Sequence, residues 1–205
     1  FYYDPAVYIS KGQGTVLSGN WWEALNWIKN NTKQCAVIAT YWDPGHFITG
    51  IANRPVVFDG ASQNAMFIMN DTNATGGLKI TRYDNSIVQI SLEKNGQITH
   101  ARIKDIGISL LTSNETLALN ILENYKKPGC DEMYYIASND LIYKSQWWSY
   151  FATWDPMKEC DTPLCKGEKY FYSPIQLSKQ TPLFLEKTMC YEYPISDRQS
   201  FILYE

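Results

Sequence analysis

Two aromatic residues and a carboxylate follow directly on an apolar run, and they are the side chains best suited to bind a ligand. Residues 36–40 are rich in apolar and β-branched types, which is typical of a buried strand. Tyr41, Trp42 and Asp43 come next. A phenol and an indole N–H donate hydrogen bonds and a carboxylate accepts them, so these three residues can hold a small hydroxyl group.

Asp43 also has a purely structural interpretation. Pro44 and Gly45 stop the strand, and proline is favoured as the first residue of a helix whose N-cap is aspartate. Asp43 would then cap one or two helical turns over 46–52, and the two aromatic residues before it would belong to the core. The sequence leaves both interpretations open.

Three common catalytic motifs are absent from the sequence. It contains no Gly-X-Ser-X-Gly nucleophile motif, no His-Glu-X-X-His zinc motif and no glycine-rich phosphate loop. No second acidic residue lies at a spacing that would identify a glycosidase pair with Asp43. If the corner at Asp43 has a function, recognition therefore suits it better than catalysis.

The five cysteines suit disulfides better than a metal site. Cys160 and Cys165 bracket four residues and could close a small loop. We expect the remaining three to be buried thiols, with one further pair left open: Cys35, Cys130 and Cys190. Zinc is the rival interpretation, but only two histidines, His46 and His100, are available to complete a site.

Composition narrows the class of protein. Of the 205 residues, 45% are apolar and 19% charged, which allows a sizeable core and argues against disorder. The net charge of −3 gives no electrostatic basis for binding nucleic acid. No apolar run is long enough to span a bilayer, and residues 1–4 have neither the basic start nor the hydrophobic middle of a signal peptide. Because the chain begins with Phe1, we expect it to be an excised piece of a longer protein.

Four Asn-X-Thr tripeptides give a weak indication of an extracytoplasmic location. They begin at Asn30, Asn70, Asn73 and Asn114.

Periodicity and turn residues predict the elements. Trp21, Leu25 and Ile28 follow a helical spacing behind a predicted N-cap at Asn20, and Asn95-Gly96 is a strong hairpin signal. In chain order we first predict a helix over 21–29, a strand over 35–41, helical turns over 46–52 and a strand over 55–58. A loop over 61–77, with an apolar piece at 65–69, should lead into an antiparallel insertion over 78–103. We then predict a helix over 112–125 that opens with the capping-box spacing Thr112–Glu115, a strand over 133–137, a helix over 140–151, and a tail of short strands and turns over 156–205.

One pattern occurs twice. Residues 35–43 and 133–140 both read as an apolar strand, then a polar capping residue, then a helix. If the two strands lie parallel in one sheet, Asp43 and the segment from Asp140 to Lys144 meet at the same edge. The predicted fold class is mixed α/β (α+β), with a helix-rich core around a small sheet. We predict one domain over 1–205, with a core at about 18–155 and the β insertion within it.

Two motifs resemble one known family. Residues 41–45 resemble the Trp-Trp-Asp-Tyr-Gly signature of oligosaccharyltransferase catalytic subunits, membrane enzymes that transfer a lipid-linked oligosaccharide to Asn in Asn-X-Ser/Thr. Residues 138–144 resemble the second motif of the family, an Asp and a Lys on a helix beside the corner. The lead-in over 22–38 and the pieces 52–54 and 59–60 also match. The resemblance covers about 18–155 and is most like the short archaeal enzymes.

The sequence departs from the family motifs at three points. Tyr41 stands in place of the first Trp, although a phenol can still donate a hydrogen bond, and Pro44 stands in place of the Tyr. Three residues separate Asp140 from Lys144, where many members have two.

The resemblance implies a role for each matched residue. The acceptor's Ser/Thr hydroxyl would bond to Asp43 and to the donors Tyr41 and Trp42, and the Lys144 helix would form the facing wall. The residues expected to support this pocket are Pro44, Gly45, Asp140 and Trp148.

The resemblance also implies the setting. The chain looks like the C-terminal globular domain of a longer enzyme, on the extracellular face of the cell membrane. Its expected partners are an acceptor polypeptide, a lipid-linked oligosaccharide held by the rest of the enzyme, and the membrane itself. The divalent metal, Mn or Mg, and the catalytic acids would belong to the transmembrane portion. We expect no metal and no catalytic residue in this chain, which should be inactive alone.

Two alternatives come from other classes of protein. The many aromatic residues also suit a non-catalytic extracellular carbohydrate-binding module. A secreted glycosidase that uses Asp43 is the third hypothesis.

Overall fold

The structure is a computed structural model that describes residues 17–62, 65–83, 86–138 and 140–172, and the backbone of three strands between 183 and 204. Its Cα positions divide the chain into two compact units, Phe1–Phe171 and Tyr172–Glu205. Each unit is described by itself. The mixed α/β class predicted from the sequence is confirmed.

A two-stranded parallel sheet lies at the centre of the first unit. Strand β1 (Val37–Ala39) pairs in parallel with β6 (Met133–Tyr135), so that Ile38 stands opposite Tyr134. The parallel pairing predicted from the repeated pattern is therefore confirmed. Residues 55–58, predicted as a second strand, contribute only a single parallel bridge between Val56 and Ile38.

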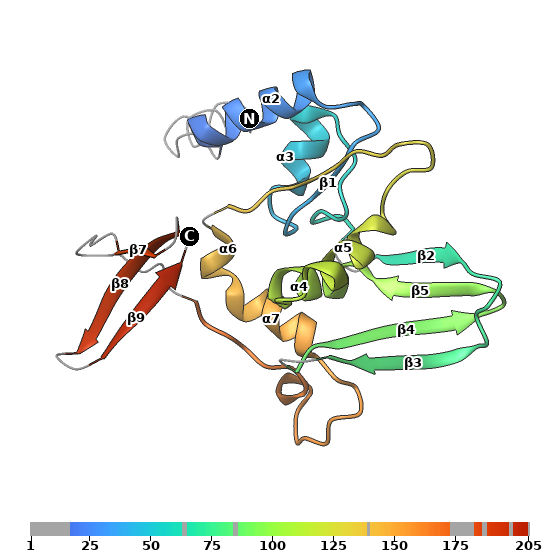
Figure 1. Cartoon of the computed structure of the whole chain (residues 1–205). Coiled ribbons are helices and arrows are strands. Elements are labelled where there is room, and N and C mark those ends of the chain that lie inside the picture. Colours follow the sequence, from blue (N-terminus) through green and yellow to red (C-terminus); the bar gives the residue numbers. More distant parts are fainter. Residues whose placement is uncertain are drawn as a thin grey trace, which may run out of the picture. The chain divides into compact units, whose positions relative to one another are not determined.

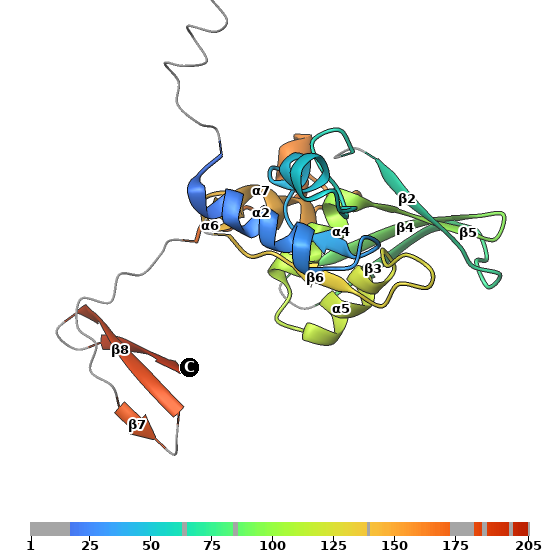
Figure 2. The ribbon, with the colours of Figure 1, turned by 90° about the horizontal axis from the view of Figure 1, so that it is seen from above.

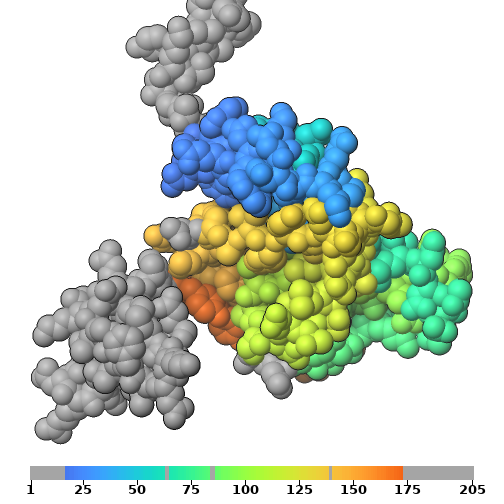
Figure 3. All heavy atoms as spheres, turned by 45° about the horizontal axis from the view of Figure 1, so that its top comes forward, coloured from blue at the N-terminus to red at the C-terminus, as the bar shows by residue number. Residues whose placement is uncertain are grey.

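Helices cover both faces of this sheet because the side chains of β1 alternate. Ile38 packs with Leu25 and Ile28 of α2 (Gly19–Asn31) on one face. Val37 and Ala39 point to the opposite face, into a cluster that includes residues of α4 (Arg102–Leu111) and α5 (Glu115–Glu123). Figure 1 shows α2 on one side of β1 and α4 and α5 on the other. In Figure 3 the chain around β6 (gold) runs between α2 (blue) and α5 (yellow-green).

Helix α2 begins at a different cap from the one predicted. Ser18 is the N-cap, and its Oγ accepts a hydrogen bond of 3.3 Å from the backbone N–H of Trp21. Asn20 lies inside the helix, because Ser18 stands at the spacing from which a side chain reaches the first free N–H groups. Leu25 and Ile28 are buried, as the helical stripe predicts.

The inserted sheet is wider than the sequence indicates. Its strands are antiparallel in the order β2-β5-β4-β3, and Figure 2 shows them projecting from the helices. Their bounds are β2 Met66–Asn70, β3 Gly77–Arg82, β4 Val88–Lys94 and β5 Gln97–Ala101. Asn95 and Gly96 have φ angles of 53° and 73°, which confirms the predicted hairpin turn. Strand β2 lies where we predicted a loop, because its pairing with β5 joins segments far apart in sequence.

The sequence did not predict where two of the helices begin. Helix α4 continues directly from β5, and Ala101 at its N-cap makes no side-chain bond, so nothing in the sequence marks its start. Helix α5 is capped by Asn114, whose Oδ1 accepts a bond of 3.1 Å from the N–H of Leu117. The predicted cap, Thr112, instead accepts a bond of 3.0 Å from the N–H of Asn114.

The helix predicted over 140–151 is broken. It forms α6 (Asp140–Tyr143) and α7 (Ser145–Thr153), and Lys144 between them has φ −98° and ψ 5°, outside the helical region. After α7 the described chain contains a short helix, η2 (Pro163–Lys166). Asn139, part of the predicted cap, lies outside the described residues.

The second unit contains an antiparallel sheet, which confirms the predicted strands of the tail. Its strand order is β7-β8-β9. The bounds are β7 Leu183–Leu185, β8 Thr188–Ser196 and β9 Gln199–Tyr204.

Two disulfides cross-link the first unit. Cys160 pairs with Cys165, as the spacing suggested. Cys35 pairs with Cys130 across 95 residues, so the expectation that these two are buried thiols is wrong. The sequence does not identify this pair, because only the β1–β6 pairing brings the two residues together. The side chain of Cys190 lies outside the described part of the chain.

The helices of the described residues are all too short or too polar to cross a bilayer.

The long-range disulfide should stabilise the fold far more than the short one. A cross-link stabilises chiefly by restricting the unfolded chain, and this effect grows with loop length. Replacing Cys35 and Cys130 together by Ser should lower the free energy of unfolding by about 4–5 kcal/mol, against about 2 kcal/mol for Cys160 and Cys165. Urea unfolding of the two double variants measures both values. Equal losses would contradict the expectation.

Candidate functional site

The ends of β1 and β6 bring two charged residues together. Asp43 follows β1, and Lys144 lies beyond β6 between α6 and α7. The Lys144 Nζ lies 2.9 Å from Asp43 Oδ2 and 2.8 Å from Asp140 Oδ2. The prediction that Asp43 and the Asp140–Lys144 segment meet at one edge is therefore confirmed.

Asp43 does not cap the helix that follows it. The N-cap of α3 (Gly45–Phe47) is Pro44, whose ring can neither donate nor accept a hydrogen bond. The helical turns continue into η1 (Ile48–Ala52). The N–H of Gly45 donates instead to the carbonyl of Trp42, at 3.1 Å. The predicted N-cap role of Asp43 is thus wrong, and its carboxylate instead contacts Lys144.

Gly45 allows the corner to pack closely against a neighbouring segment. A Cβ atom at this position would lie 2.6 Å from Asp59 Cβ and 2.8 Å from the carbonyl oxygen of Phe58. Real Cβ atoms do not approach backbone so closely, so only glycine fits here without displacing the chain. Pro44 and Gly45 thereby hold the residues before them against residues 58–59.

The two aromatic residues of the corner have different surroundings. Tyr41 is buried, with its ring edge-on to that of Phe58 at a centroid distance of 6.0 Å. Burial raises the pKa of Tyr41 to about 12, opposed by a hydrogen bond from Trp42 and reinforced by the charge of Asp43. Tyr41 therefore stays a neutral phenol at physiological pH. Trp42 is only partly buried, and its ring lies 6.3 Å from that of Tyr41.

Lys144 is held as an ammonium ion by two carboxylates. Burial lowers its pKa, but a hydrogen bond to Asp140 and the negative charges of Asp140 and Asp43 outweigh burial and raise it. Burial likewise raises the pKa of Asp140, but hydrogen bonds from Lys144 and Ser138 outweigh it, and the pKa lies below its usual range. Lys144 and Asp140 are therefore both charged at neutral pH.

Lys144 contacts only one oxygen, Oδ2, of the Asp43 carboxylate. Its Oδ2 is buried and, among the described residues, accepts no well-directed hydrogen bond, so the 2.9 Å contact with Lys144 is an ion pair. The side chain as a whole is 32% exposed. This exposure must lie on the other atoms of the side chain, which leaves the carboxylate open to a donor from outside.

A hollow of about 380 Å³ opens at this point. It is lined by the four predicted binding residues and by three more that the sequence analysis did not identify. The lining residues are Tyr41, Trp42, Asp43, Lys144, Ile103, Trp147 and Phe151.

Two of the three additional residues carry a signal that sequence reasoning could have used. Lys144, Trp147 and Phe151 follow one another at helical spacing, so a helix that presents the lysine presents both rings nearby. Ile103 had no such signal, because it belongs to α4, which we did not predict.

Trp148 lies behind the hollow. It is buried, and its indole Nε1–H donates to the carbonyl of Leu141 at 2.8 Å, which ties α7 to α6 across the break at Lys144.

The arrangement does not suit hydrolysis. A glycosidase needs a carboxylic acid whose pKa is raised, whereas the pKa of Asp140 is lowered and Asp43 is paired with an ammonium ion. In the described part of the chain, no three His, Cys, Asp or Glu side chains gather as metal ligands would.

Adding a methyl group at Gly45 should damage the corner. Because the new Cβ would overlap residues 58–59, Gly45→Ala should lower the free energy of unfolding by about 1–3 kcal/mol. Gly50→Ala is the matched control, since no atom lies within 4 Å of a Cβ there. It should be neutral or raise that free energy by up to about 1 kcal/mol. Urea unfolding distinguishes them, and equal effects would be inconsistent with close packing at Gly45.

Removing the ammonium group should raise the pKa of Asp140. A lowered carboxyl pKa stabilises the fold above the unfolded pKa of about 4, and this contribution is lost as the pH falls through the folded value. In Lys144→Met, the bond and the charge that lower the pKa of Asp140 are lost while burial still raises it, so Asp140 should titrate at higher pH. NMR titration of its carboxyl carbon measures the change. Lys126→Met, which removes the exposed pair with Glu123, should leave Asp140 unchanged; an unchanged Asp140 in Lys144→Met would contradict the assignment.

Comparison with known proteins identifies relatives of this chain. No family model matches it. A dolichyl-phosphooligosaccharide-protein glycotransferase of Methanocaldococcus jannaschii is 50% identical over 48 residues, which cover 23% of this chain and 5% of that protein. A protein of the same name from Methanococcus voltae is 26% identical over 164 residues, which cover 66% of this chain and 18% of that protein.

The chain thus spans less than a fifth of the length of these relatives. The solved C-terminal globular domain of an oligosaccharyltransferase from Archaeoglobus fulgidus has 18% identity and a TM-score of 0.36, over 69% of this chain and 70% of that one. By the sequence matches, this chain is homologous to stretches of archaeal dolichyl-phosphooligosaccharide-protein glycotransferases.

Proposed function

We propose that the hollow at Asp43 binds the Ser/Thr hydroxyl of Asn-X-Ser/Thr acceptors. The observation that carries this proposal is the placement of Asp43. Its Oδ2 is held 2.9 Å from Lys144 Nζ, while the rest of the side chain remains exposed to the hollow. A hydroxyl that enters can donate to a carboxylate already fixed in position.

Lys144 acts in this proposal as a positioning residue. Its ammonium group lies between Asp43 and Asp140, which fixes the orientation of the Asp43 carboxylate before the acceptor binds. A preorganised acceptor group loses little side-chain entropy on binding. Asp140 and Trp148 support Lys144, the first by its charge and the second by tying α7 to α6.

Apolar side chains around the carboxylate give the hollow a preference for Thr over Ser. Ile103, Trp147 and Phe151 line it beside the charged residues, and the extra methyl of Thr can pack against them. Trp42 and the neutral phenol of Tyr41 provide the donors at the corner. Because these walls also exclude water, the hydroxyl bond forms at a partly desolvated site.

In the whole protein this binding would contribute to transfer by positioning. Holding the Ser or Thr places the acceptor Asn at a fixed distance from the sugar donor. We propose that the chain works within a longer membrane enzyme that supplies the lipid-linked oligosaccharide and the divalent metal. The two disulfides support a location on the extracytoplasmic face, since disulfides persist in oxidising compartments.

Removing the Asp43 carboxylate should abolish selective binding of the acceptor. Loss of one buried hydrogen bond costs about 1–3 kcal/mol, so a peptide with Asn-Ala-Thr should bind roughly 5- to 150-fold more tightly than one with Asn-Ala-Val. In Asp43→Asn this ratio should approach one. NMR titration of the tryptophan indole signals measures both peptides against both proteins.

Asp71→Asn is a control that removes a carboxylate from the turn after β2, away from the hollow. It should keep the Thr/Val ratio. Equal binding of the two peptides by the unchanged protein would overturn the proposal. Binding of glycans in place of peptides would favour the carbohydrate-binding alternative.

A further inference from the structure

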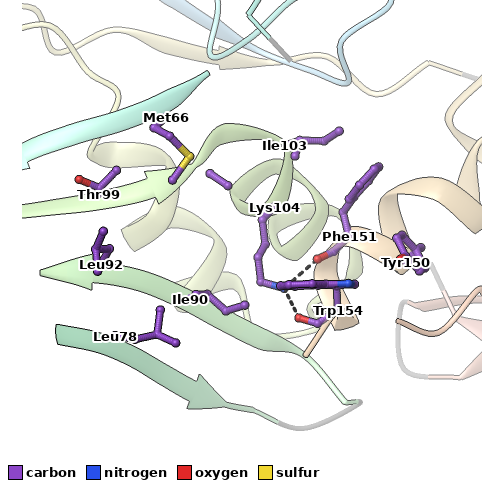
Figure 4. A pocket seen from close by; sticks show the side chains of 11 residues that line it. Met66, Leu78, Ile90, Leu92, Thr99, Ile103, Lys104, Tyr150, Phe151 and Trp154 are labelled. Carbon is purple, nitrogen blue, oxygen red and sulfur yellow. Dashed lines mark hydrogen bonds between the residues drawn. The ribbon is translucent and has the colours of Figure 1, made fainter. Parts of the chain in front are cut away.

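A second hollow of about 390 Å³ adjoins the first, and the proposed hydroxyl site does not use it (Figure 4). Side chains of the four-stranded sheet, among them Met66 and Leu92, form one wall. Side chains of α7 and the residue after it, Phe151 and Trp154, form the other. The hollow therefore lies between the inserted sheet and the helix that also carries part of the hydroxyl site.

The two hollows share walls. Ile103 and Phe151 line the hydroxyl hollow at Asp43 and also line the apolar hollow. The two hollows therefore lie side by side, and a bound segment of extended chain can reach both.

The charge that lines the apolar hollow is paired. Among the described residues that line it, Lys104 alone is charged, and its Nζ donates to the carbonyls of Phe151 and Trp154, both at 2.8 Å, as the dashed lines in Figure 4 show. A third carbonyl, that of Ala152, lies 3.4 Å away. Since the ammonium group is occupied at the end of α7, the hollow suits an uncharged ligand.

Its rim leaves apolar surface exposed. Met66 is 50% and Leu92 47% exposed, although both are large hydrophobic residues. Covering such surface is favourable, and a concave hollow is filled better by a single bulky side chain than by a flat lipid surface.

We propose that this hollow is a subsite for a bulky apolar side chain of the acceptor polypeptide that lies close in sequence to its Ser or Thr. This inference rests on the proposed function, because the hydroxyl site gives the polypeptide its position. It adds a preference outside the Asn-X-Ser/Thr tripeptide, for aromatic or long aliphatic residues such as Phe, Leu or Met.

The test uses the whole chain and peptides that contain Asn-Ala-Thr with otherwise small polar flanks. One Phe is placed in turn at each flanking position on either side, and binding is followed by NMR of the indole signals. At one of these positions, the peptide with Phe should bind roughly tenfold more tightly than its Ala counterpart. Its Thr→Val version should lose affinity as well.

Two matched variants test the location. Leu92→Ser, at the rim of the hollow, should reduce the Phe/Ala ratio to below about twofold while keeping the Thr/Val ratio. Ile68→Ser is the control, because Ile68 lies two residues after Met66 on the same face of β2 and is 57% exposed, but does not line the hollow. Both positions are exposed, so both variants should fold, which thermal unfolding checks.

The outcomes separate the two proposals. A Thr/Val difference without any Phe/Ala difference would overturn the subsite and leave the hydroxyl site standing. Equal loss of the Phe preference in Leu92→Ser and Ile68→Ser would also overturn it. Binding to phosphatidylglycerol vesicles that both variants reduce, with no Phe preference, would instead identify the sheet face as a lipid contact. Absence of any Thr-dependent signal would remove both proposals.

Discussion

Parallel pairing of β1 with β6 is the constraint on which the candidate site depends. Each strand has only three residues, so the pair needs support at its ends. The Cys35–Cys130 disulfide lies just before the two strands and the Asp43–Lys144 ion pair just after them. Because parallel strands end at the same edge, this pairing places the residues that follow β1 beside those that follow β6.

The sequence predicts the site better than the fold around it. Asp43 and Lys144 each follow a short apolar strand, and this local pattern, met twice, was sufficient to predict that they meet. What it could not settle was the role of Asp43, because Asp before Pro-Gly is also a good N-cap. In the structure Pro44 is the N-cap, and the Asp43 carboxylate contacts Lys144.

The elements that were missed depend on partners far away in the sequence. Strand β2 becomes a strand by pairing with β5, and a polar, Asn-rich neighbourhood conceals it. Helix α4 starts without a cap, and its Ile106 and Ile108 are fully buried among other elements. The Cys35–Cys130 pair was likewise not predictable from the sequence, because five cysteines allow many pairings and only the fold selects one. Tertiary contacts decided each of these outcomes.

A lysine contacts each end of α7, one among carboxylates and the other among backbone carbonyls. Lys144, before the helix, lies between Asp43 and Asp140, and these carboxylates raise its pKa against the effect of burial. Lys104 donates to carbonyls at the other end, where burial lowers its pKa to about 7 against the attraction of nearby carboxylates. One lysine thus holds the Asp43 carboxylate in place, and the other is bonded to the end of the helix. Since α7 contributes Phe151 to both hollows, its placement couples the hydroxyl site to the apolar surface of the inserted sheet.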